Sequence, residues 1–116
     1  MTEIKNPKQY DLEERTLKFS KSVIEFCNKL PKTLANIEII KQLIRSAGSI
    51  GANYIEANES LSKKDFVMRV KICRKEAKET RYWLVLSQVR ESDKQNLIKE
   101  TNELMKIFGA ILEKCK

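Results

Sequence analysis

Four amphipathic segments, each with apolar or small residues at alternating steps of four and three, constrain the fold of this chain most strongly. In the third segment these positions are Phe66, Val70, Cys73, Ala77, Thr80, Leu84 and Ser87. Such spacing places one strip of side chains along a single face of a long helix. Only three glycines and two prolines occur among the 116 residues. The sequence therefore predicts long helices joined by short turns.

Polar residues that can cap a helix precede each segment. The expected caps are Asp11 with Glu14 for the first helix, Thr33 or Asn36 for the second, Ser62 with Asp65 for the third and Ser92 with Gln95 for the fourth. Pro31 is expected to end the first helix, and the second is expected to reach about Asn58. Short turns make neighbouring helices antiparallel, so we expect an all-α, up-down-up-down four-helix bundle. It would form a single domain over residues 1–116, with residues 1–10 as a loosely ordered N-terminal arm.

Composition narrows the class of protein. Residues 1–11 are polar, without the apolar core of a signal peptide, and no apolar stretch is long enough to span a membrane. A cytoplasmic protein is therefore expected. Cys27, Cys73 and Cys115 each occupy an apolar position of a different predicted helix, which favours small core residues over disulfides or reactive thiols. The chain has no histidine, and its cysteines lack ligand spacing, so we expect no metal site and no cofactor.

The second predicted helix carries small residues in its middle. Two glycines, Gly48 and Gly51, cost about 1 kcal/mol each relative to alanine in a helix. A helix tolerates that cost where another backbone approaches closely, so tight packing inside the bundle is expected. A phosphate-binding loop is the weaker alternative, because the glycine-lysine pattern of such loops is missing.

The third predicted helix has more apolar surface than one face can bury. Residues 82–86 are apolar all round, and Ile72 extends the surplus on the side of Leu86. No helix of a four-helix bundle is fully enclosed, so another chain is expected to cover this surface. The interface of a homo-oligomer is predicted at Ile72, Trp83 and Leu86.

Basic charge is concentrated in the same helix. The chain has a formal net charge of +7, and residues 63–81 contain eight basic and three acidic residues. Steps of three, four and three align four cations along one face, here called the basic stripe: Lys71, Arg74, Lys78 and Arg81. Such a stripe is typical of a protein that binds a phosphate backbone. The alternative is a solvated face balanced by Glu76 and Glu79.

Two carboxylate pairs raise the question of catalysis. Glu56 with Glu59, or Glu76 with Glu79, could share a helix face, but no nucleophile or ligand set accompanies them. We interpret them as ion-pair partners of Arg45 and Arg74. Asn53 falls among packed positions and is expected to join a small hydrogen-bond network. The sequence therefore indicates a protein that is not an enzyme.

Two sequence blocks carry a family resemblance. The first is Arg45-x-x-x-Ser49-Ile50-Gly51-Ala52-Asn53-x-x-Glu56-Ala57, and the second is Asp65-Phe66 followed by Lys75-Glu76-Ala77-x-Glu79-Thr80-x-x-Trp83-Leu84. They resemble the bacterial four-helix-bundle family that includes proteins encoded within intervening sequences of 23S ribosomal RNA genes. Relatives include the accessory variability protein of diversity-generating retroelements. The resemblance implies a homopentamer with a central channel, nucleic-acid binding, a reverse transcriptase or other protein as partner, and no established enzymatic activity.

Two functions remain open at this point. One is a homo-oligomeric accessory module that binds RNA or DNA through pooled basic stripes. The other is a structural or protein-interaction scaffold whose basic face is only solvated. Clustering of the basic stripes on one face of the assembled oligomer would favour binding, whereas ion pairing of the stripe to acidic helices would favour the scaffold.

Overall fold

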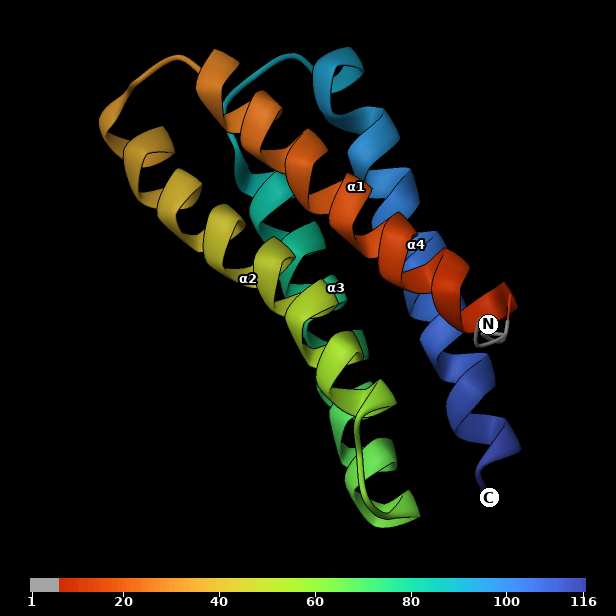
Figure 1. Ribbon diagram of the computed structural model, residues 1–116. Helices are drawn as coiled ribbons and strands as arrows, with labels where there is room; N and C mark the ends of the chain where they lie inside the picture. The colour runs from red at the N-terminus through yellow and green to blue at the C-terminus, as the bar shows by residue number, and fades with distance from the viewer. Residues whose placement is uncertain (1–6) are drawn as a thin grey trace.

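The computed structural model describes residues 7–116, and their side chains from Leu12 onward. It contains four helices, α1 (Pro7–Lys29), α2 (Leu34–Asn58), α3 (Lys63–Leu86) and α4 (Glu91–Lys114), and no strand among the described residues. Successive helices run antiparallel (Figure 1). The turns α1–α2 and α3–α4 lie at one end, and the α2–α3 turn lies at the other. The predicted all-α, up-down-up-down bundle is confirmed.

Two of the predicted caps are confirmed. Thr33 caps α2, and its Oγ1 accepts a hydrogen bond from the Asn36 backbone N–H at 3.1 Å. Ser62 caps α3 in the same way, with its Oγ 3.1 Å from the Asp65 backbone nitrogen. Each hydroxyl satisfies one N–H that the first turn of a helix leaves without an intrahelical partner.

The other two predicted helix starts are wrong. α1 already begins at Pro7, so Asp11 lies inside the helix, and residues 7–10 are helical rather than part of an arm. Proline suits a first helical position because its missing N–H has no partner there. Residues 1–6 lie outside the described residues. α4 begins at Glu91, before Ser92. Arg90 is its N-cap residue, and no described side chain forms a capping hydrogen bond with the first backbone N–H groups. The acidic side chains of Glu91 and Asp93 in its first turn stabilise the helix, because they interact favourably with the positive end of the helix dipole.

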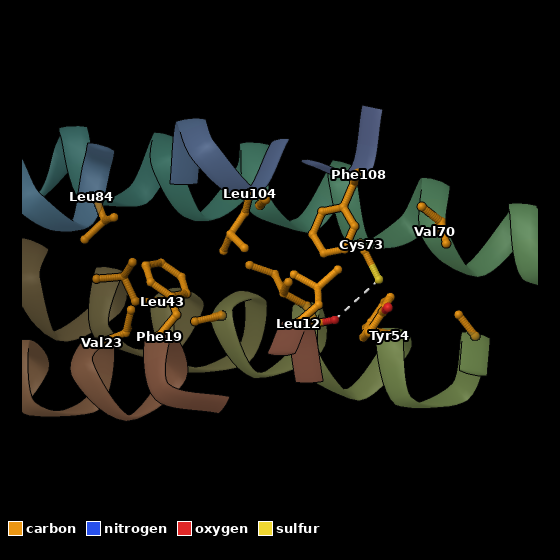
Figure 2. Packing of buried hydrophobic residues seen from close by; sticks show 14 of the residues in the cluster. Leu12, Phe19, Val23, Leu43, Tyr54, Val70, Cys73, Leu84, Leu104 and Phe108 are labelled. Carbon is orange, nitrogen blue, oxygen red and sulfur yellow. Dashed lines mark hydrogen bonds between the residues drawn. The ribbon is translucent and has the colours of Figure 1, made fainter. Parts of the chain in front are cut away.

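The core lies along the predicted helix faces. Figure 2 shows Val23 and Phe19 of α1, Leu43 of α2, Leu84 of α3 and Leu104 of α4 around a common interior. All five side chains are buried. Farther along the bundle, the rings of Tyr54 and Phe108 pack at 6.0 Å between centroids. The alternating four-and-three spacing therefore identifies the buried face of each helix.

Three threonines occupy core positions. Thr16, Thr80 and Thr101 are buried, and each hydroxyl bonds to a backbone carbonyl of its own helix. The corresponding oxygen–oxygen distances are 3.1, 2.8 and 2.6 Å. Because the hydroxyl finds its partner locally, a threonine can stand among apolar side chains without a buried unpaired group.

One end of the bundle is held together by side chains that bond to the turns. Asn36 is fully buried, and its Nδ2 donates to the carbonyls of Pro31 and Gln88 at 2.9 and 3.1 Å. Its Oδ1 accepts from the Gln88 backbone N–H at 2.9 Å. Nearby, the buried Lys94 donates to the carbonyls of Val85 and Ser87, both at 2.8 Å. The α1–α2 and α3–α4 turns are thus joined although they are far apart in sequence.

The expectation for the cysteines is correct for two of the three. Cys27 and Cys73 are buried and free, and burial raises their pKa values to about 11 and about 12. Both are therefore protonated, unreactive thiols at neutral pH. Cys115 differs from the prediction: it is the C-cap of α4 and only half-buried, because it lies at the end of the helix.

Candidate functional site

The two sequence blocks face each other across the α2–α3 interface. Arg45 of α2 forms ion pairs with Glu76, at 3.4 Å, and with Glu79 of α3. Glu79 Oε2 also accepts a hydrogen bond from Trp83 Nε1 at 2.9 Å. The Trp83 hydrogen bond, followed by the hydrogen bond and charge of Arg45, lowers the pKa of the Glu79 carboxyl, although partial burial opposes the shift. Arg45 is thus linked to Trp83 through Glu79.

The same interface continues toward the α2–α3 turn through smaller groups. The buried hydroxyls of Thr80 and Ser46 lie 2.8 Å apart, and the Cys73 thiol donates to the Ile50 carbonyl at 3.4 Å (dashed line in Figure 2). Close helix approach is possible here because the interface contains small residues in place of bulky ones.

The expected network around Asn53 is also present. Arg69 donates to Asn53 Oδ1 at 2.8 Å, and Asn53 Nδ2 donates to the backbone and side-chain oxygens of Ser49, both at 2.9 Å. Glu56, one turn farther along α2, is exposed and lies outside this network. These contacts tie α3 to α2 at a partly buried position, so Ser49 and Asn53 have a structural role.

Gly51 is packed against α1 as predicted. A Cβ atom added at Gly51 would lie 3.1 Å from Thr16 Oγ1, closer than an ordinary van der Waals contact. At Gly48 the nearest atom, Ser20 Oγ, is 4.0 Å away. Only Gly51 is therefore required for the α1–α2 approach, and its neighbours show no phosphate-binding loop.

The basic stripe lies on the solvent-exposed side of α3. Lys71, Arg74, Lys78 and Arg81 are all exposed, and none of them forms an ion pair or a side-chain hydrogen bond with a described residue. The expected pairing of Arg74 with a glutamate is wrong, because Glu76 and Glu79 face α2 and are held by Arg45. From Lys71 to Arg81 the stripe is about 15 Å long, at about 1.5 Å per residue.

Several cations elsewhere on the surface have acidic partners, whereas others, such as Lys75 and Lys99, are exposed and form no ion pair with a described residue. Arg15 of α1 binds Glu100 of α4 at 2.7 Å. The remaining surface pairs lie within single helices or at their ends: Lys41–Glu38, Arg90–Asp93, Lys106–Glu103 and Lys116–Glu113. The lack of such partners therefore distinguishes the basic stripe from these paired surface cations.

The comparisons with known proteins can now be set beside this geometry. The family model of the 23S rRNA-intervening sequence proteins matches residues 8–114 of this chain. The chain belongs to this family. Because the match extends over all four helices, the resemblance carried by the two facing blocks is confirmed for the whole described bundle.

A solved structure agrees with the assignment. A protein of unknown function from the S23 ribosomal protein family of Bacteroides thetaiotaomicron VPI-5482 is 28% identical to this chain. The alignment covers 91% of this chain and 98% of that protein, with a TM-score of 0.83. No curated protein matches significantly. The comparisons identify no enzymatic family.

In this member of the 23S rRNA-intervening sequence family, the predicted oligomer residues share a side of α3 but differ in exposure. Leu86 is 47% exposed, whereas Ile72 and Trp83 are half-buried. Trp83 packs against the protomer's own core in addition to its bond with Glu79. Two of the three predicted interface residues are therefore less exposed than the sequence suggested, although Met68, Tyr82 and Val85 add exposed apolar surface on α3.

A second apolar surface was missed by the sequence reasoning. Ile37, Ile44 and Ile55 of α2 are 40, 44 and 51% exposed, and their spacing places them on one line of the helix. Leu17 and Ile24 of α1, 56 and 42% exposed, flank Ser20, which faces Gly48 of α2. We call these five residues the α1–α2 apolar row. The signal was present in the spacing of the isoleucines, which continues outside the core face.

A cavity of about 380 Å³ lies elsewhere, between the C-terminal part of α1 and the start of α4. Phe26 and Leu97 line it together with charged Glu25, Lys29 and Asp93. None of the predicted site residues borders it. Among the described residues, no group of three histidine, cysteine, aspartate or glutamate side chains could hold a metal ion. No described helix is long and apolar enough to cross a membrane.

Proposed function

We propose that this protein is a non-enzymatic, cytoplasmic accessory module that binds the phosphate backbone of RNA or DNA through the basic stripe of α3. The observation that supports this proposal is the set of four exposed cations without an acidic partner among the described residues. A phosphate backbone supplies the missing negative charges, and release of its counterions drives binding. Among the residues whose side chains are described, the stripe forms no ion pair of the kind that would have favoured the scaffold.

The contacts proposed here are with phosphates, so they carry no base-specific information. Binding should tolerate changes of sequence and fall steeply with salt. If one protomer engages about four phosphates, log K should decrease with log salt at a slope of roughly −3 to −4. Several protomers bound to one nucleic acid would make the slope steeper.

The test is a fluorescence-anisotropy titration with structured RNA and with duplex DNA at low and moderate salt. Arg74→Glu combined with Lys78→Glu reverses two charges in the middle of the stripe and should abolish binding. Lys99→Glu combined with Lys106→Glu, at exposed cations of α4, is the matched control and should bind like the wild type. A wild type that does not bind at low salt, or a stripe variant that binds equally well, would leave the scaffold as the better function.

We also propose that the protein self-associates through the α1–α2 apolar row. The row exposes five large apolar side chains, more than the Ile72, Trp83 and Leu86 set. Lys41 and Glu38 beside the row pair at 3.5 Å, so the α2 side of the row carries no net charge at this point. On the α3 face the unpaired cations of two copies would repel. A second copy is therefore the partner that this surface suits, and assembly would pool the basic stripes.

A further inference from the structure

An exposed aromatic ring lies at the end of the basic stripe. Tyr82 follows Lys78 by one helical turn, which places the two side chains one above the other on α3, and it directly follows Arg81. The Tyr82 side chain is 58% exposed. Backbone binding by the stripe makes no use of this ring. Because the ring lies beside these cations, it would be close to any ligand that occupies the stripe.

The ring is held by its neighbours from one side. Tyr82 packs edge-to-face with Trp83, with ring centroids 5.1 Å apart and planes at 76°. Trp83 is itself fixed by its hydrogen bond to Glu79, by the Arg45 ion pair behind that carboxylate and by packing on the core. Because Trp83 is held by these contacts, it supports one side of the Tyr82 ring, while more than half of the Tyr82 side chain faces solvent. A ring that is held on one side loses less conformational entropy when a ligand stacks on it.

We propose that Tyr82 is a stacking platform for an unpaired base, and that this face of α3 binds single-stranded nucleic acid in preference to duplex. The proposal rests on the backbone binding proposed above and names the form of nucleic acid that the same site selects. Bases in a duplex are stacked on each other and present only their edges, so a protruding tyrosine cannot reach their faces. An unpaired base can stack on Tyr82 while its flanking phosphates contact Lys78 and Arg81.

The charge of the surface favours a polyanion over a protein partner. Val85 and Leu86, next to Tyr82, are 51 and 47% exposed and could also contact protein. Yet Lys78 and Arg81 flank the ring without an acidic partner among the described residues, and burying them against a protein would require new counter-charges. Phosphates flanking a stacked base supply these charges at the required positions. Ribose and deoxyribose strands offer the same combination, so RNA and DNA should both bind.

The experiment measures anisotropy for a short labelled oligouridylate, for oligothymidylate of the same length and for a duplex of that length. Wild type should bind both single strands more tightly than the duplex. Tyr82→Ala should weaken single-strand binding by about 5- to 150-fold, the range expected for one stacked base, and leave duplex affinity unchanged. Tyr82→Phe keeps the ring and should keep the affinity. Circular dichroism of each variant checks the helical fold.

The outcomes separate this inference from the proposed function. If the stripe variant Arg74→Glu with Lys78→Glu loses binding but Tyr82→Ala binds single strands like the wild type, backbone binding stands and the stacking platform is overturned. Equal or tighter binding of wild type to duplex overturns it as well. If wild type binds none of the probes, both proposals fail. A change in the assembled mass of Tyr82→Ala, without selective loss of single-strand affinity, would make Tyr82 a contact between copies and also overturn the inference.

Discussion

At the scale of the single residue, Gly51 shows how one missing side chain sets a helix–helix distance. Thr16 of α1 occupies the space that a Cβ atom at Gly51 would need. Thr16 is itself buried, and its hydroxyl is engaged with the Glu13 carbonyl at 3.1 Å. It therefore has little freedom to move aside, and a large residue at position 51 must push α1 away from α2.

Gly51→Leu should lower the free energy of unfolding by about 1–3 kcal/mol, because overpacking forces the two helices apart. The measurement is chemical denaturation at matched protein concentration, followed by circular dichroism. Gly109→Ala is the control: nothing lies within 4 Å of an added Cβ at Gly109, so the better helix propensity of alanine should raise stability by up to about 1 kcal/mol. Unchanged stability of Gly51→Leu would show that α1 and α2 do not need this close approach.

At the same scale, the sequence predicted the residues that act through a local pattern and missed those that depend on a distant partner. Thr33 and Ser62 cap their helices because their partners lie three residues away. The sequence named both Arg45 and Arg74 as partners of the carboxylates; Arg45 is confirmed, but the sequence could not decide between the two, because 34 residues separate Arg45 from Glu79. Only the docking of α2 on α3 decides which arginine a carboxylate meets.

At the scale of the element, helix faces were predictable and helix ends less so. The four-and-three spacing marks the buried side of each helix because only one side can face the core. The starts of α1 and α4 were misplaced, since Pro7 and the acidic residues after Arg90 allow a helix to begin without a side-chain cap. The α1–α2 apolar row was overlooked because a search for one apolar face per helix stops once that face is found.

The turns provide the element-scale prediction. Asn36→Ala removes three hydrogen bonds that join the α1–α2 and α3–α4 turns, and it takes away the side-chain partner of partly buried backbone groups of Pro31 and Gln88. The free energy of unfolding should fall by about 2–3 kcal/mol. Thermal and chemical unfolding would measure the loss. Asn96→Ala, at an exposed α4 position, is the matched control and should stay within about 0.5 kcal/mol of wild type. Similar values for the two variants would rule out a structural link between the turns through Asn36.

At the scale of the whole molecule, the protomer has two surfaces of different character. α3 carries unpaired positive charge, and the α1–α2 apolar row carries exposed aliphatic side chains on other helices. The sequence predicted the first surface; its expectation of self-association through α3 stays a prediction, beside the α1–α2 apolar row proposed here. Which side of a helix remains uncovered depends on how its neighbours dock, and that cannot be read from one helix alone.

Light scattering at micromolar concentration should give a multiple of the 13.5 kDa protomer mass. Ile44→Glu places a charge in the middle of the α1–α2 apolar row and should shift the protein toward the protomer mass, because burying an unpaired carboxylate is unfavourable. Leu86→Glu, on α3, is the comparison variant and should leave the assembly intact. Dissociation by Leu86→Glu alone would return the interface to α3, and a monomeric wild type would exclude self-association.

The hydrogen bonds between α2 and α3 have a consequence for how the chain folds. The pairs Thr80–Ser46, Cys73–Ile50 and Arg69–Asn53 join residues only 34, 23 and 16 positions apart, whereas the Arg15–Glu100 ion pair spans 85. Contacts between near neighbours in sequence need short loops to close and therefore form rapidly. We therefore expect the central hairpin to form early in folding, before α1 meets α4. Both sequence blocks lie in that hairpin, so the same residues that mark the family would set the rate at which its members reach their native state.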